Sequence, residues 1–140
     1  MNAPAKIIGD DARREAQALL ARCKEERWKL LQQFARLEIK LQRGLPKPPK
    51  TFGSKVRAWI KEDPTAKRFE SLIPARNLVA HAFIQCIEFK GVTSALWEIA
   101  DGTGDLNCKK LDDVALNDWA RQLLSLIDEA IVAAEAMKKR

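Results

Sequence analysis

The chain has 140 residues, of which 46% are hydrophobic and 31% charged, as is typical of one soluble globular domain over residues 1–140. This composition excludes a disordered chain, and no apolar run reaches the ~20 residues that a membrane helix needs. The net charge of +6 is unevenly spread, because residues 1–61 carry +9 and residues 62–140 carry −3.

The first expected element is a long helix from Asp10 to Arg43, a segment without Pro or Gly. Asp10 or Asp11 can cap its start, and Gly44 can end it. Its apolar residues recur at alternating spacings of four and three, which predicts one buried stripe: Ala16, Leu20, Cys23, Leu30, Phe34, Leu37 and Leu41.

Prolines and glycines divide the next part of the chain. Residues 45–53 hold three prolines and are predicted to form a loop. Ser54 can cap a short helix that runs through Glu62, with an inner side formed by Val56, Trp59 and Ile60. Pro64 or Thr65 then opens another helix, which Pro74 kinks or restarts, and the restarted helix is expected over residues 75–90 with Gly91 as its stop.

The end of the chain combines a strand pattern with a last helix. In residues 92–111, alternation places Ala95, Trp97 and Ile99 on one face, and Asp101–Gly104 has turn chemistry. The last helix is expected over residues 116–138, with the stripe Leu116, Trp119, Leu123, Ile127, Ala130, Ala134 and Met137. The predicted fold is mainly α: an up-and-down helical bundle of four to five helices with a small β-hairpin before the last helix.

A basic segment lies between Ile39 and Lys61, where seven bases and no acid occur and where Phe52 and Trp59 are interleaved. Such a segment favours a phosphate backbone with unstacked bases, and an ordinary solvated surface is the alternative. The basic side chains are expected at the surface. The candidate RNA-binding residues are Lys47, Lys50, Lys55, Arg57, Trp59 and Lys61.

The segment Arg76-Asn77-Leu-Val-Ala-His81 holds the only histidine of the chain. On an ideal helix, Asn77 and His81 share a narrow polar face with Glu88, whereas Arg76 falls in a broad apolar arc beside Phe83 and Ile87. This apolar arc is wider than the surface that one helix needs to bury in a bundle, so we expect part of it to contact a second copy of the chain. An arginine can clamp a phosphate and a histidine can move protons near neutral pH, although structural hydrogen bonds are the alternative roles.

In an all-helical chain, the spacing Arg76-Asn77-x-x-x-His81 resembles the R-x4–6-H motif of the HEPN superfamily, in which a polar residue often follows the arginine. The resemblance, supported by the order of elements over residues 10–138, implies a helical bundle that dimerises with its motif helices facing each other. Many members are metal-independent ribonucleases, often toxins or phage-defence proteins. It implies that Arg76 contacts the scissile phosphate, that Asn77 orients the reacting group or the phosphate, and that His81 is the general acid or base. Other members keep the fold without cleaving RNA, so a catalytically silent module that binds nucleotide, RNA or protein is the alternative.

Some catalytic members add a polar residue from an earlier helix. Arg27, which occupies a core slot in the first helical stripe, and its neighbour Glu26 are the candidates here. The alternative for Arg27 is a packed stem with a solvated head.

Other chemistries find little support in the sequence. The first residues lack the apolar core of a signal peptide, and the three cysteines form no CxxC motif, so we expect a cytoplasmic protein with reduced thiols and without a metal or other cofactor. The expected partners are a second copy of the chain, RNA, and a cognate antitoxin or defence partner, with no membrane. A purely structural dimerisation bundle remains the third reading.

Overall fold

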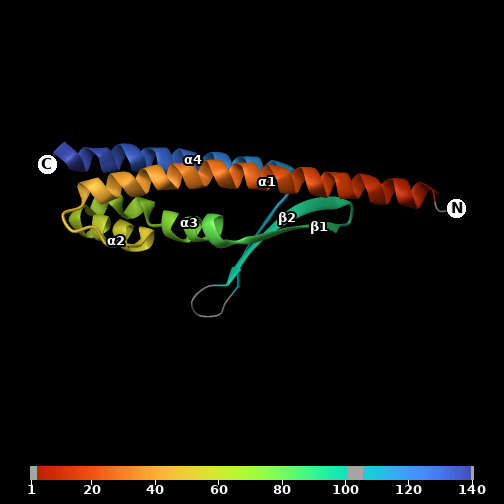
Figure 1. The fold of residues 1–140 in the computed structure, drawn as a ribbon, viewed down its shortest axis with the longest axis horizontal. Coiled ribbons are helices and arrows are strands. Elements are labelled where there is room, and N and C mark those ends of the chain that lie inside the picture. The colour runs from red at the N-terminus through yellow and green to blue at the C-terminus, as the bar shows by residue number, and fades with distance from the viewer. Residues whose placement is uncertain (1–2, 101–105, 140) are drawn as a thin grey trace.

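The computed structural model describes residues 3–100 and 106–139. Figure 1 shows two long helices, α1 and α4, side by side, with the remaining elements gathered along α1. In chain order the elements are α1 (Ala3–Gly44), α2 (Phe52–Glu62), the 3-10 helix η1 (Pro64–Phe69), α3 (Leu72–His81), the strands β1 (Phe83–Phe89), β2 (Val92–Ala100) and β3 (Leu106–Leu111), α4 (Asp113–Glu135) and the 3-10 helix η2 (Ala136–Lys139). The fold is thus mainly helical, with a small antiparallel sheet immediately before the last long helix, as predicted at this coarse level.

The long helix α1 follows the predicted stripe over most of its length. Five stripe residues are buried: Cys23, Leu30, Phe34, Leu37 and Leu41. Toward the N-terminus, Leu19 rather than Leu20 takes the buried position. Gly44 ends the helix as predicted, but the helix begins at Ala3, so neither Asp10 nor Asp11 is its cap.

The helices α1 and α4 run parallel to each other. Arg22 pairs with Asp113 at the start of α4, the Gln33 amide donates to Asp128 at 2.8 Å, and Lys40 pairs with Glu135 at 3.2 Å near its end. The expectation of an up-and-down bundle is therefore wrong for this pair. The sheet and the short helices return the chain along α1, so α4 begins beside the middle of α1 (Figure 1).

The short helices begin and end at local signals. Thr51, not Ser54, caps α2, because its hydroxyl accepts a hydrogen bond from the Ser54 N–H at 3.1 Å. The residues after Asp63 form a 3-10 helix rather than an α-helix. Since α3 begins at Leu72, Pro74 lies in its first turn. Backbone N–H groups in the first turn have no acceptor within the helix, so a proline, which lacks this N–H, is tolerated there. Pro74 therefore neither kinks nor restarts the helix.

The predicted helix over residues 75–90 is wrong beyond His81. The following segment, Phe83–Phe89, is rich in aromatic and β-branched residues and forms β1, which pairs antiparallel with β2. Lys90 and Gly91 both have positive φ angles, 51° and 78°, and close a two-residue turn, so Gly91 serves the turn and not a helix end. The expected hairpin is present as β2 and β3, but it is two thirds of a three-stranded sheet, and its predicted turn at Asp101–Gly104 lies outside the described residues.

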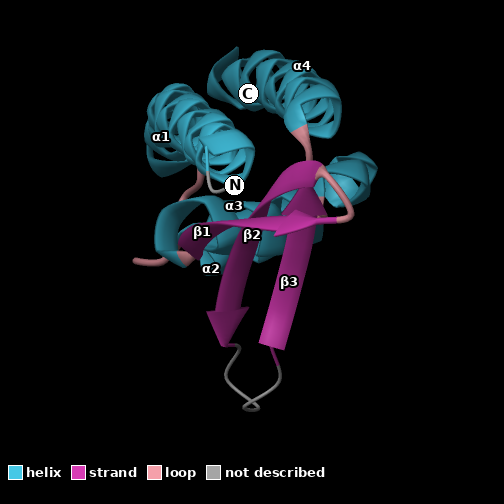
Figure 2. Cartoon of the chain, turned by 90° about the vertical axis from the view of Figure 1, so that its right-hand side faces the viewer, coloured by secondary structure: helices cyan, strands magenta, loops and turns pink. Residues whose placement is uncertain are grey.

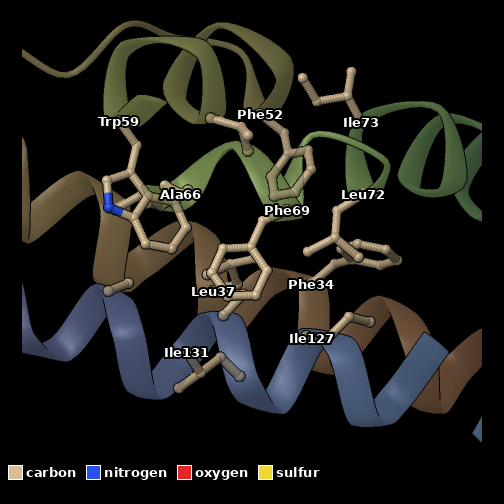
Figure 3. Close-up of a cluster of buried hydrophobic side chains, with 14 of the residues drawn as sticks. Phe34, Leu37, Phe52, Trp59, Ala66, Phe69, Leu72, Ile73, Ile127 and Ile131 are labelled. Atoms are coloured by element: carbon tan, nitrogen blue, oxygen red, sulfur yellow. The ribbon is translucent and has the colours of Figure 1, made fainter. Parts of the chain in front are cut away.

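Two clusters of buried side chains form the core. The larger lies between α1, α4 and the short helices, where Trp59 stacks on Phe69 with ring centroids 5.3 Å apart (Figure 3). The smaller lies under the sheet and includes Cys23, Ala95 and Trp97, the last two pointing inward as predicted. Ile99 is only partly buried.

The last long helix begins earlier than its apolar stripe. The start of α4 at Asp113, capped by the Asp112 carboxylate at 2.8 Å from the Ala115 N–H, comes before the predicted Leu116. None of the helices in the described ranges is at once long enough and apolar enough to cross a bilayer.

Candidate functional site

The motif residues lie on α3, the last turn of which ends at His81. Asn77 and His81 are one turn apart and both exposed, so they share the solvent face as predicted. Arg76 is half-buried on another side, about 140° around the helix from His81. The residues predicted to accompany them on a continuing helix, Phe83, Ile87 and Glu88, lie on β1 instead, so that part of the predicted apolar arc is wrong.

Arg76 is held against α2. Its guanidinium carbon lies 5.9 Å from the centre of the Phe52 ring, within the range of a cation–π contact. Among residues 3–100 and 106–139, no carboxylate, carbonyl or other acceptor pairs with this guanidinium. A half-buried charge without a counter-ion is unfavourable, so this position attracts an anion.

A second arginine lies at the same end of α2. The Arg57 guanidinium packs on Gly53, where a Cβ would stand 3.4 Å from its Nη1 atom. Gly53 and Phe52, the two residues that Arg57 and Arg76 contact, form the first turn of α2, where the helix dipole is positive. Arg57 and Arg76 thus each contact a residue of the first turn of α2, whereas Arg76 and His81 lie on different sides of α3 within one copy.

Arg27 joins α1 to the C-terminal end of α3. Its Nε donates to the Val79 carbonyl at 2.8 Å, a terminal guanidinium nitrogen donates to the Ala82 carbonyl, and its guanidinium carbon lies 5.2 Å from the Trp97 ring centre. These two carbonyls flank His81 in the sequence, at the point where the helix leaves acceptors without helical partners. Arg27 therefore holds the end of α3 against the sheet, rather than projecting its head into water.

Burial lowers the pKa of the Arg27 guanidinium below its ordinary value, although an arginine still carries its charge at neutral pH. Glu26, the other candidate from α1, pairs with Lys29 at 3.7 Å within the same helix. The two candidates thus differ. Arg27 positions the C-terminal end of α3, which carries the motif, whereas Glu26 pairs with a lysine of its own helix.

The basic segment divides into exposed and buried members. Lys47, Lys50, Arg57 and Lys61 are exposed as predicted. Lys55 and Trp59 are 4% and 1% exposed, so the predictions that Lys55 lies at the surface and that Trp59 meets a base are wrong. Trp59 is committed to Phe69, and Lys55 donates to Glu38 at 3.0 Å and to the Lys50 carbonyl at 2.9 Å.

We expect Lys55→Met to lower the free energy of unfolding by about 2–3 kcal/mol, because it leaves the Glu38 carboxylate and a backbone carbonyl without their donor. Chemical denaturation monitored by tryptophan fluorescence measures this change. Lys61→Met, an exposed lysine on the same helix, is the matched control and should change stability by less than about 0.5 kcal/mol. Equal stabilities of the two variants would contradict a structural role for Lys55.

The described residues also include cysteines and side chains of the types that ligate metals. Burial raises the pKa of the Cys23 thiol and of the Cys86 thiol, so both remain protonated near neutral pH and neither supplies a thiolate nucleophile. Within the described ranges, no group of three or more His, Cys, Asp or Glu side chains is arranged to hold a metal ion.

Two exposed aromatic residues of β1 are functional candidates that the sequence analysis does not single out. Phe83, two residues after His81, and Phe89, at the far end of β1, are 68% and 61% exposed. Phe83 and Phe89 are six residues apart, which places them on the same side of a strand but on different sides of a helix. A helical assignment of this segment therefore hides that they share one face.

Comparison of the chain with protein-family models, with curated proteins and with solved structures found no match.

Proposed function

We propose that this chain is a metal-independent endoribonuclease that acts as a homodimer of HEPN-like helical domains, in the manner of toxin or defence ribonucleases. The observation that carries the proposal is the half-buried Arg76 guanidinium, which has no acidic partner among the described residues and shares α3 with an exposed Asn77 and His81. An arginine without an acidic partner can bind a phosphate, and an exposed imidazole on the same helix can transfer a proton to the site of a second copy.

In the proposed reaction, the RNA 2′-hydroxyl attacks the adjacent phosphorus and expels the 5′-oxygen of the next nucleotide. His81 transfers a proton at this step, and Arg76 stabilises the charge that develops on the phosphorane oxygens. Asn77 orients the phosphate or the imidazole from the same solvent face. The products are a 2′,3′-cyclic phosphate and a free 5′-hydroxyl, and DNA is spared because it lacks the nucleophile.

The exposed basic residues supply the electrostatic attraction for the substrate. Arg57 contacts the same turn of α2 as Arg76, and Lys50 and Lys61 lie exposed at either end of this helix region. Such positive charge favours a polyanion near the motif and makes affinity fall with salt.

One observation favours a second function, a silent module that binds RNA, nucleotide or protein. Arg76 and His81 lie on different sides of α3, so one copy alone does not direct both at one phosphate. A second copy that presents its own α3 to the first would supply the missing group, which is why the proposal includes a dimer.

Incubation of total RNA with the purified protein in EDTA tests the proposal. We expect discrete fragments that end in 2′,3′-cyclic phosphate, and we expect Arg76→Lys to lose most of the activity because an ammonium cannot reproduce the two-pronged contact of a guanidinium with phosphate. RNA that is bound but never cut would instead establish the silent module, and cleavage that requires Mg²⁺ would contradict the mechanism.

A further inference from the structure

The sheet has one covered and one open face. The long helices α1 and α4 lie on one side of it (Figure 2), where Ala95 and Trp97 are buried. The other side, here called the open face, carries alternate residues of each strand: Phe83, Gln85, Ile87 and Phe89 from β1, Val92, Ser94, Leu96 and Glu98 from β2, and Cys108 and Lys110 from β3. Ser94, in the middle of this face, is buried. Phe83, Phe89 and Val92 are each more than half exposed, which is unusual for apolar side chains gathered on one surface.

Charge is distributed unevenly over the open face. At one end, the Nζ atoms of Lys90 and Lys110 lie 5.4 Å and 5.8 Å from the centre of the Phe89 ring. At the other end, Glu98 is paired across the strands with Phe83, and its carboxylate accepts a hydrogen bond from the Gln85 amide at 3.3 Å. A phosphate is therefore favoured beside Phe89 and disfavoured next to Glu98 at the Phe83 end of the face.

The size of the open face helps to identify its occupant. Three strands about 4.8 Å apart and seven residues long at ~3.3 Å per residue give a footprint of roughly 330 Å². A protein partner in a standard interface buries about 800 Å² of each surface, so this face is small for a second copy. An exposed aromatic ring with two lysines over it, as at Phe89, suits single-stranded nucleic acid, because bases stack on aromatic side chains while lysines meet the phosphates.

We infer that the open face is a base-stacking subsite for single-stranded RNA, and this inference rests on the proposed function. Phe83 holds the base next to the phosphate at His81, and Phe89 holds a base farther along the strand, with its phosphates at Lys90 and Lys110. The two rings are six residue steps apart along β1, a span of about 20 Å, which roughly six nucleotides cover at the stacked rise of ~3.4 Å along a strand. A base taken onto Phe83 leaves its neighbour unstacked, which frees the ribose between them to bring its 2′-hydroxyl into line with the scissile bond.

The test measures binding apart from cleavage. A fluorescein-labelled 12-nucleotide single-stranded RNA is titrated in EDTA with the His81→Ala protein, and the same background then receives Phe83→Leu, Phe89→Leu or both. Each substitution should weaken binding by about five- to one-hundred-fold, the range expected for losing one stacked base, whereas affinity for the same sequence as a duplex should not change. Trp28→Leu, which truncates an exposed aromatic residue on α1, is the matched control and should leave the affinity unchanged.

Two further measurements keep the outcomes distinct. Phe83→Trp should retain or strengthen binding, because it preserves the stacking surface, and thermal melting should show that all variants are folded. Unchanged affinity in the double Phe variant would overturn the subsite even if the wild type cleaves RNA. Loss of a dimer in that variant by sedimentation velocity, with RNA affinity intact, would also overturn it and assign the face to a second copy. Stacking-dependent binding without any cleavage by the wild type would support the subsite while rejecting the ribonuclease.

Discussion

His81→Ala should abolish RNA cleavage in EDTA, with a fall in rate of about 10²- to 10⁴-fold, the usual contribution of a general acid or base. The chain contains no other imidazole that could replace the lost one. Because His81 is exposed at the last position of α3, its removal should leave the midpoint of thermal unfolding within about 2 °C of the wild-type value. Quantified cleavage of a labelled RNA, together with a melting curve, measures both effects.

The matched control for this variant is Ser71→Ala. Ser71 is exposed at the opposite end of α3, and its side chain makes no capping hydrogen bond, so its loss should affect neither rate nor stability. Full activity of His81→Ala would remove the imidazole from the mechanism. A rate loss accompanied by a large fall in the melting midpoint would show that His81 acts through the fold.

Arg27→Met should lower the free energy of unfolding by about 3–4 kcal/mol. The substitution removes two charge-assisted hydrogen bonds, worth roughly 1.5–3 kcal/mol each before any compensation, and leaves the Val79 and Ala82 carbonyls without that donor. The contact with Trp97 is lost as well, although methionine retains much of the apolar stem. For a chain of this size, the midpoint of thermal unfolding should fall by roughly 10–15 °C.

Arg36→Met serves as the control. Arg36 lies exposed on the same helix, and its guanidinium donates a hydrogen bond only to a side chain of that helix, Gln33, at 3.2 Å. Below its melting temperature, Arg27→Met should lower kcat more than it raises KM, since a frayed end of α3 misplaces His81 while Arg57 and Arg76 still attract RNA. Equal melting midpoints for the Arg27 and Arg36 variants would contradict the positioning role.

The sequence predicted those parts of the fold that local periodicity determines. The stripe from Cys23 to Leu41 and the inward pair Ala95 and Trp97 follow from spacing alone, and the structure confirms them. The segment from Phe83 to Phe89 was misassigned, since its apolar residues also fit a helical arc and Gly91 can end a helix or close a turn. Pairing with β2, which local patterns do not reveal, decides in favour of the strand.

The same limit applies to the candidate site. Exposure of Asn77 and His81 followed from their shared helical face. By contrast, the burial of Lys55 depends on Glu38 from another helix, and the contacts of Arg27 join it to carbonyls 52 and 55 residues away. Contacts between residues so far apart in the sequence form only in the folded chain, and they leave no periodic pattern from which they could be predicted.

The parallel pairing of α1 and α4 has a consequence for how the protein is made. Gln33 and Asp128, which bond across this pair, are 95 residues apart in the sequence, so α1 leaves the ribosome long before its partner exists. During that interval, Leu30, Phe34 and Leu37 form an apolar stripe that α4 does not yet cover. At a synthesis rate of about 5–20 residues per second, this lasts roughly 5–20 s, which is ample time for a chaperone to bind the nascent helix or for neighbouring chains to associate. Completion of the core must therefore wait until α4 has been synthesised.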